Sequence, residues 1–454
     1  MFAQIPRPHA YGLRSLGATR GVVLGLGCAT PSRDRAWVAD ELGHRTGFTL
    51  RAAGDKPKGL PPQVRIDDGL NEDEAVAVAL WNSPAFAADL ERLSLATADF
   101  RQASRIDNPQ LYVGAPIGSI VAAASLVAPL TSLLTISRRT EAADLMVSSV
   151  AESLVQTGLD LIRDVRVAHT DRALAERRLR IARELERNAG QLAVLAEARA
   201  SAGEISRAEA LAVRADASVA TDGTQMAERD LTIASGRLQA LLGGSVGVEL
   251  NVEVERQLPR TAPALDELLL VARRSRPDVL ALELELRGAA ERAGWERWRI
   301  LALSAQADVQ WDSQRVGARV GGVIELPIFN QNQGGVGRAE AAIESARYRA
   351  DALRQQVALE VLTARAQLQQ AIASQRRYQD AILPPLADAL AAATERYELG
   401  DDAYIVVLDA LRRLGTARLR AAELDAEVRR AQAQLERAVG ARLERLGQPK
   451  KDSR

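Results

Sequence analysis

The stretch "LALSAQADVQWDSQRVGARVGGVIELPIFNQNQGG" (Leu301–Gly335) passes from one periodicity to another, and this change decides the fold. From Leu301 to Trp311 the odd positions are apolar and the even ones are small or polar, which is the pattern of a half-buried β-strand. After a polar turn, a second alternating run extends to Ile328. From Gly334 onward the chain is rich in Ala, Arg, Glu and Leu, which favours a long helix. The stretch therefore predicts a β-hairpin that leads into a helix.

Each strand of this predicted hairpin has one apolar face and one polar face. In the second strand, Arg319, Gly321 and Glu325 lie opposite the apolar residues. Strands of about ten residues with this alternation are typical of transmembrane β-hairpins. The alternative is an edge hairpin of a water-soluble sheet, which shows the same alternation.

The chain repeats its turn residues at a nearly constant spacing. Two glycines and two prolines of the first half each have a counterpart 193 to 198 residues later. The pairs are Gly203 and Gly400, Gly243 and Gly440, Pro129 and Pro327, and Pro84 and Pro277. Four pairs at nearly one offset indicate an internal duplication.

Each half is predicted to hold a short helix, two strands, a helix of about 65 residues, a glycine turn and a returning helix of about 39 residues. The first half opens at Asn71, which can cap a helix, and Glu74 stands at the reciprocal capping-box position. In the second half the long helix is expected from Gly334 to Leu399, with Pro384-Pro385 kinking or breaking it. Helices of roughly 100 Å must pack along their length against others.

The first half contains a segment open to two interpretations. Val113–Ile136 has 24 residues without a charge, which by length alone is typical of a membrane-spanning helix. Its prolines and glycines, and its place opposite the second hairpin in the duplication, favour a β-hairpin that turns near Gly118-Ser119.

Four strands per chain cannot close a barrel. An open sheet edge in lipid leaves backbone groups unpaired, at a cost of several kcal/mol each. Membrane hairpins of this kind therefore require several copies of the chain, and three copies would supply twelve strands. The long helices would then extend away from the membrane as a bundle.

Four segments carry a family resemblance. They are "NEDEAVAVALWNSPAFAADLERLSLATADFRQASRIDNPQL" from Asn71, "RPDVLALELEL" from Arg276, "LPIFNQNQGG" from Leu326 and "YELGDDAYIVVLDA" from Tyr397. In these segments the chain resembles the outer-membrane efflux proteins, the TolC-like channel-tunnel family, over about Leu70–Gly440. The "PIFNQNQG" motif is most similar to that of members paired with heavy-metal RND efflux pumps.

The resemblance implies a mostly α fold with a small β part, made of long α-helical hairpins and four transmembrane strands per protomer. It further implies a homotrimer with a 12-stranded barrel in the outer membrane of a Gram-negative bacterium and a helical tunnel through the periplasm. A periplasmic adaptor (membrane fusion) protein and an inner-membrane RND-type pump are the implied partners, besides outer-membrane lipid. The glycine turns would contact the adaptor, at Gly203 and Ser206 in "AGEIS" and at Gly400 and Asp401 in "LGDDA". Ala403 lacks the small hydroxyl that Ser206 supplies in the first turn.

The resemblance also implies a gate at these tips. Tyr397 matches the family's gate tyrosine, and Glu209 falls where its carboxylate partner is expected. Asp409 matches one acidic residue of the constriction, whereas the other ring position holds Val406 and a gate-arginine position holds Asp402. The alternatives are simple packing between helices for Tyr397 and a solvated helix face for Asp409.

The N-terminus resembles a bacterial lipoprotein signal. The apolar run "GVVLGLGC" follows three arginines, and Gly27 is the small residue before Cys28, the expected lipidation site. The alternative is an incidental thiol. The expected organisation is a signal peptide (1–27), an N-terminal extended segment (28–69), two efflux repeats (70–250 and 251–442) and a polar tail (443–454).

Composition excludes several classes of function. With 59 basic and 59 acidic residues, no overall positive field favours nucleic acid. The three histidines are far apart and the chain has one cysteine, so the sequence shows no metal cage, and we predict no cofactor. No catalytic motif is recognisable, and we predict that the chain is not an enzyme.

The sequence therefore predicts a passive exit duct of a tripartite efflux system, for metal cations delivered by the pump. Export of drugs or of type I secreted polypeptides would use the same architecture. A structural coiled-coil or scaffold protein is the alternative of another class, and it predicts heptad seams without amphipathic strands.

Overall fold

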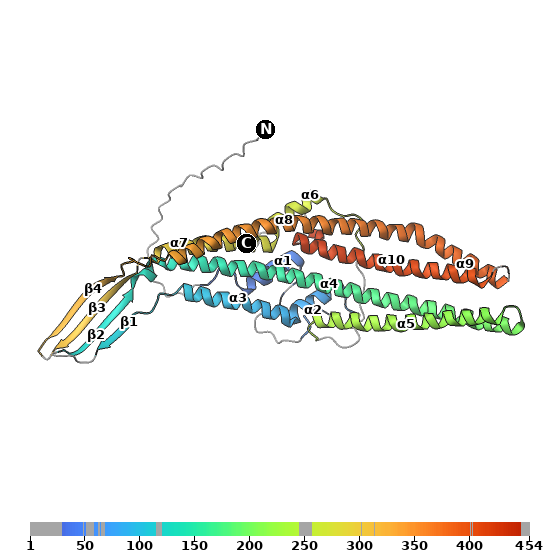
Figure 1. Ribbon diagram of the computed structural model, residues 1–454, viewed down its shortest axis with the longest axis horizontal. Helices are drawn as coiled ribbons and strands as arrows, with labels where there is room; N and C mark the ends of the chain where they lie inside the picture. The colour runs from blue at the N-terminus through green and yellow to red at the C-terminus, as the bar shows by residue number, and fades with distance from the viewer. Residues whose placement is uncertain are drawn as a thin grey trace, which may run out of the picture.

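The computed structural model describes residues 30–48, 50, 59–61, 64, 69–114, 120–244, 257–300, 302–312, 314–399, 401 and 403–445. The chain is long and narrow, with a four-stranded sheet at one end and two helical hairpin tips at the other (Figure 1). The predictions for the signal peptide, Cys28, the turn at Gly118-Ser119, Gly400 and Asp402 fall outside the described residues.

The order of elements in the first half recurs in the second. The first half holds α2 (Glu72–Asn82), α3 (Pro84–Ala103), β1 (Gln110–Gly114), β2 (Ile120–Pro129), α4 (Leu130–Ala202) and α5 (Arg207–Leu241). The second holds α6 (Leu265–Ser275), α7 (Pro277–Trp298), β3 (Leu303–Asp312), β4 (Val316–Ile324), α8 (Gln333–Arg377), a π-helical turn (Tyr378–Ile382), α9 (Leu383–Leu399), α10 (Tyr404–Val439) and a 3₁₀ turn (Leu443–Arg445). This recurrence agrees with the predicted duplication.

Two expectations for the N-terminal part of each half need correction. The single short helix is in fact a pair, because Pro84 and Pro277 each begin a second helix and hold the preceding residue extended, with ψ 117° at Ser83 and 125° at Arg276. The predicted extended segment 28–69 also contains a helix, α1 (Arg35–Thr46). The capping box of Asn71 and Glu74 at the start of α2 is confirmed.

The long helices are close to their predicted lengths. α4 has 73 residues, because the helix begins at Leu130 directly after the strand. In the second half the helix runs from Gln333 to Leu399 without a break, and the π-helical turn lies just before Pro384-Pro385. A π-helical turn gives the chain a way to accommodate prolines that cannot donate backbone hydrogen bonds.

All four strands form one antiparallel sheet in the order β1-β2-β3-β4. The membrane-helix interpretation of Val113–Ile136 is therefore wrong, because this segment contributes β1 and β2 before α4 begins. Among the described helices, α4 alone has a window apolar enough to cross a membrane, but 67% of that window is buried in the protein. Its apolar residues are those of a core helix.

The register gives the sheet two different faces. Paired residues of antiparallel strands point to the same side, so Ala124, Val309 and Ala318 share one face. Every described residue on that face is apolar or glycine. They are Leu111, Val113, Ala122, Ala124, Leu126, Ala128, Leu303, Ala305, Ala307, Val309, Trp311, Val316, Ala318, Val320, Gly322 and Ile324. The opposite face carries the polar residues Gln110, Tyr112, Ser125, Ser304, Gln306, Asp308, Gln310, Asp312 and Arg319, together with Ile120, Val127, Pro129, Val323 and small residues.

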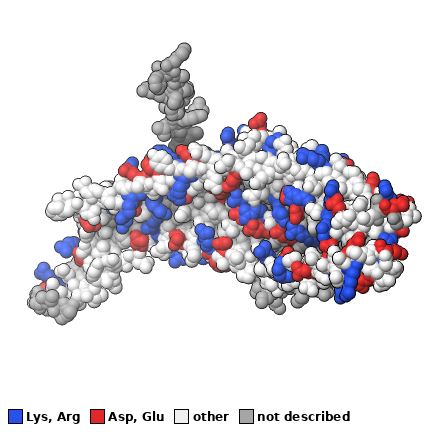
Figure 2. Space-filling model, turned by 45° about the vertical axis from the view of Figure 1, so that its right-hand side comes forward, with Lys and Arg blue, Asp and Glu red and all other residues white. Residues whose placement is uncertain are grey.

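The helical body has a different surface. Figure 2 shows acidic and basic residues intermixed over the helices, whereas the sheet end is mostly white. Within the body, one apolar cluster joins α1, α2 and α3 to α4, and another joins α6 and α8 to α10. The charged surface of the helical body is suited to water, whereas the apolar face of the sheet is not.

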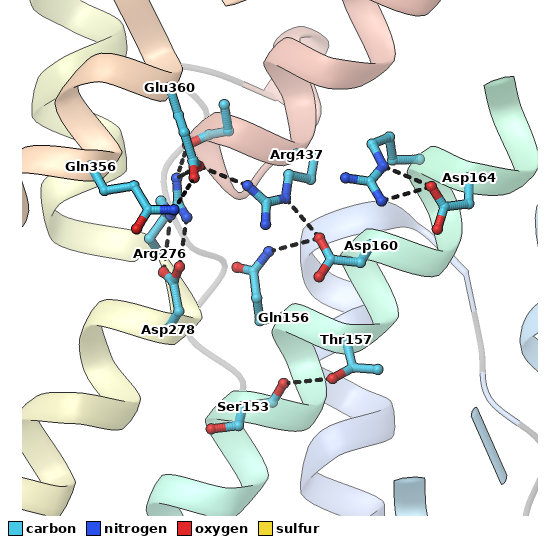
Figure 3. Close-up of polar contacts among 12 residues, drawn as sticks. Ser153, Gln156, Thr157, Asp160, Asp164, Arg276, Asp278, Gln356, Glu360 and Arg437 are labelled. Carbon is cyan, nitrogen blue, oxygen red and sulfur yellow. Dashed lines mark hydrogen bonds and ion pairs between the residues drawn. The ribbon is translucent and has the colours of Figure 1, made fainter. Parts of the chain in front are cut away.

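A chain of ion pairs joins the two halves near the middle of the molecule (Figure 3). Arg276, 1% exposed, donates to Asp278 at 2.5 Å and to Glu360 at 2.6 Å. The same Glu360 oxygen accepts from Arg437 at 2.7 Å, and Arg437 donates to Asp160 at 2.7 Å. This series of ion pairs thus links α7, α8, α10 and α4.

Candidate functional site at the helical tips

The first tip is a tightly capped turn between α4 and α5. Gly203 has φ +79° and ends α4 in the left-handed conformation, which favours glycine over residues with a side chain. The Ser206 hydroxyl accepts a hydrogen bond of 3.1 Å from the Glu209 backbone N–H and so caps α5. Both residues predicted to contact the adaptor are exposed. The first tip is therefore a preformed, solvent-facing turn.

The second tip, between α9 and α10, is capped differently. The exposed Asp401 donates its backbone N–H to the Arg396 carbonyl at 2.9 Å. Ala403 occupies the N-cap of α10 and provides no side-chain hydrogen bond, as its sequence predicted. A helix without its side-chain cap loses about 1 kcal/mol relative to one with Ser, so α10 begins less firmly than α5.

An aromatic pair lies at the centre of the tips. Tyr397 is 3% exposed, and its ring centroid is 6.2 Å from that of Tyr404 in an edge arrangement. The pair belongs to an apolar cluster with residues of α4, α5 and α10, including Ala196, Val213 and Val407. The buried position of Tyr397 agrees with the packing interpretation, and its role in a gate remains a prediction.

Tyr404 was not singled out from the sequence. Burial, with the charge of Asp216 adding to it, raises the pKa of Tyr404 to about 12. Within the described chain its buried hydroxyl oxygen has no hydrogen-bond partner. Tyr404 is therefore a neutral, buried side chain at any physiological pH.

Arg199 of α4 is the cation that sequence reasoning missed. Its guanidinium carbon lies 4.3 Å above the Tyr397 ring, and Nη2 donates to the Tyr397 carbonyl at 3.3 Å. Nε lies 3.7 Å from the carboxylate of Glu204. Arg199 stands four residues before Gly203, as Arg396 stands four before Gly400, so the duplication could have pointed to it. Arg199 fastens the end of α4 to the end of α9.

The predicted acidic residues are placed apart from this cluster. Within the described chain, Tyr397 contacts Arg199 and Tyr404 rather than the half-buried Glu209. Asp409 is exposed on α10 and pairs with Arg413 one turn later, at 2.7 Å. A contact between Tyr397 and Glu209 therefore requires a second subunit and stays a prediction.

A second link joins the hairpins further from the tip. Arg412 of α10 donates to Asp216 of α5 at 2.5 Å. In the described part of the chain, no group of three or more His, Cys, Asp or Glu side chains is arranged to hold a metal ion. The tip is thus a set of packed and ion-paired helix ends.

Comparison with known proteins shows which protein family the chain resembles. Residues 268–441 match the family model described as outer membrane efflux protein. Over this segment the chain is similar to the outer membrane efflux protein family. It is also 31% identical, over 254 residues, to the cobalt-zinc-cadmium resistance protein CzcC of Cupriavidus metallidurans, an alignment that spans 54% of this chain and 60% of the relative.

Solved structures extend the likeness to nearly the whole chain. A crystal structure of CusC is similar with a TM-score of 0.69 at 20% identity, covering 87% of this chain and 98% of that one. The outer membrane protein VceC of Vibrio cholerae gives 0.69 at 18% identity, covering 82% and 96%. The fold is the TolC-like channel-tunnel fold, as the sequence predicted.

Proposed function

We propose that the chain is the passive outer-membrane exit duct of a tripartite efflux system and that its cargo is metal cations. The observation that supports this best is the sheet, with one wholly apolar face and two unpaired edges, β1 and β4. In lipid such edges are tolerated only if neighbouring copies pair with them. We infer a homotrimer in which β1 of one subunit pairs with β4 of the next, which gives twelve strands.

The shape of the molecule supports the proposed partners. The helical tips lie at the end opposite the sheet, so in a membrane-anchored trimer they project away from the outer membrane (Figure 1). A periplasmic adaptor there, followed by an inner-membrane RND-type pump, would supply cargo and energy. The scaffold alternative is wrong, because it requires a chain without amphipathic strands.

Metal cations are proposed as cargo from the relatives. The name of CzcC refers to cobalt, zinc and cadmium resistance. Loss of the chain should make its host sensitive to these metals, and growth on graded metal concentrations would measure it. A host that became sensitive to drugs alone would show that the cargo is drugs and not metal cations.

The tip provides a test of gating. Arg199→Gln removes the cation over the Tyr397 ring and the bond to its carbonyl. A desolvated cation–π contact contributes about 1–2 kcal/mol, so the open probability should rise roughly five- to thirtyfold. Single-channel recording in planar bilayers measures it, with Arg347→Gln, an exposed residue of α8, as the control.

A paired variant separates the two interpretations of Tyr397. Tyr397→Phe with Glu209→Gln keeps the ring under Arg199 but removes the hydroxyl and the carboxylate of the predicted gate. If the gate joins these residues across subunits, conductance should rise. If conductance and open probability both stay unchanged while Arg199→Gln raises the open probability, Tyr397 packs the tip and Glu209 has no part in the gate.

A further inference from the structure

Three strands place polar residues together in the middle of the sheet. Asp308 is the sixth of the ten residues of β3, and its register partners are Ser125 on β2 and Arg319 on β4. All three lie on the polar face, opposite the wholly apolar one. If the apolar face contacts lipid, these side chains face the inside of the barrel.

The Asp308 carboxylate is held from three directions. It accepts from the Ser125 hydroxyl at 2.6 Å, from the Gln306 amide at 2.7 Å and from Arg319 Nη2 at 3.2 Å. The Gln306 amide also donates to the Ser125 hydroxyl at 3.1 Å, which closes the cluster. A carboxylate with this many donors stays in one orientation.

The two charges differ in how far they reach the solvent. The Asp308 side chain is 14% exposed, whereas that of Arg319 is 77% exposed. Within the described strand residues, the charged side chains are Asp308, Arg319 and Asp312, the last at the far end of β3. At mid-depth, the interior therefore presents a guanidinium with a shielded carboxylate beneath it.

We propose that the Asp308–Arg319 pair sets the charge selectivity of the barrel lumen. The inference rests on the proposed function, because it requires the polar face to line an aqueous duct. Charges on the wall of a narrow, low-dielectric passage act strongly on passing ions. Arg319 cancels Asp308, so the middle of the barrel is close to neutral, and a cation cargo meets neither a deep well nor a high barrier there.

Reversal potentials in planar bilayers under a KCl gradient test the pair. Arg319→Gln uncovers the carboxylate and should raise the K⁺ to Cl⁻ permeability ratio about two- to fivefold over the wild-type trimer. Asp308→Asn leaves the guanidinium without its counter-charge and should lower the ratio by a similar factor. The double variant should return close to the wild-type ratio, because it restores neutrality.

The control is Arg92→Gln, which removes an exposed arginine of α3, outside the strands, and should leave the ratio unchanged. Asp308→Asn keeps the shape of the native side chain, Arg319→Gln shortens a side chain that is 77% exposed, and a trimer in native mass spectrometry confirms assembly before recording. Unchanged ratios in both single variants, or shifts of both in the same direction, overturn the inference. A protein that conducts no ions even when Arg199→Gln has been introduced to open the tip would instead contradict the proposed duct.

Discussion

Val320→Arg is expected to abolish assembly of the barrel, whereas Gly321→Arg, one residue later, is expected to leave it in place. Val320 is the fifth of the nine residues of β4 and is 85% exposed on the apolar face. An arginine at the middle of the lipid-facing surface costs about 2–4 kcal/mol, and a trimer incurs this cost three times. The outer-membrane yield should fall to background.

The matched substitution changes only the face. Gly321 pairs with Gln306 on the polar side, and a Cβ added there would meet no atom within 4 Å. The added arginine would then extend into water. Fractionated membranes and native electrophoresis report the assembled trimer for both variants. Equal yields, whether both high or both low, would show that the two faces are not distinguished by lipid.

Arg276→Met is expected to destabilise the helical body by about 3–5 kcal/mol, since it removes the buried cation that the half-buried carboxylates of Asp278 and Glu360 share. Arg276 is enclosed by α7, α8 and α10, and its Nη1 also donates to the Ala438 carbonyl at 3.1 Å. Burial alone would raise the pKa of Glu360, but the hydrogen bonds from Arg276 and Gln356 and the charges of Arg276 and Arg437 lower it overall. Arg276 is therefore one of the groups that stabilise the ionised carboxylate.

The midpoint of thermal unfolding, followed by circular dichroism in detergent, measures the effect. The matched control is Arg347→Met, whose pair with Glu344 is exposed on α8 and whose loss should change stability by less than about 0.5 kcal/mol. Because the pKa of Glu360 lies below its ordinary value of 4.5, its contribution is present above that pH and is lost as pH falls through the lowered pKa. Equal midpoints for both variants would show that the ion-pair chain does not join the two halves.

Much of this fold could be predicted from local patterns. The alternation from Leu301 to Ile328 predicted both strands of the second hairpin, because a regular change between apolar and polar residues is a strong signal for a strand. The first hairpin lacks that alternation, since its small residues suit either a strand or a helix, and only the duplication favoured strands. The split of each short helix in two was not predicted from the sequence. Pro84 and Pro277 cause the split, because a proline keeps the preceding residue out of the helical conformation.

The site was less predictable, because its contacts join distant positions. Arg199 meets Tyr397 across 198 residues, and Arg276 meets Glu360 across 84. Periodicity reports which face a residue occupies, but it does not report which residue of another helix faces it. The glycine turn at Gly203 depends on local sequence, and its prediction is confirmed.

The mass of the detergent-extracted protein tests the central proposal most directly, since every argument about the lumen and the tips requires the sheets of several chains to close one barrel. Light scattering or native mass spectrometry should give three chains per particle, and the particle should need detergent to stay in solution. A single chain that remains soluble in water without detergent would contradict the barrel and the duct built on it.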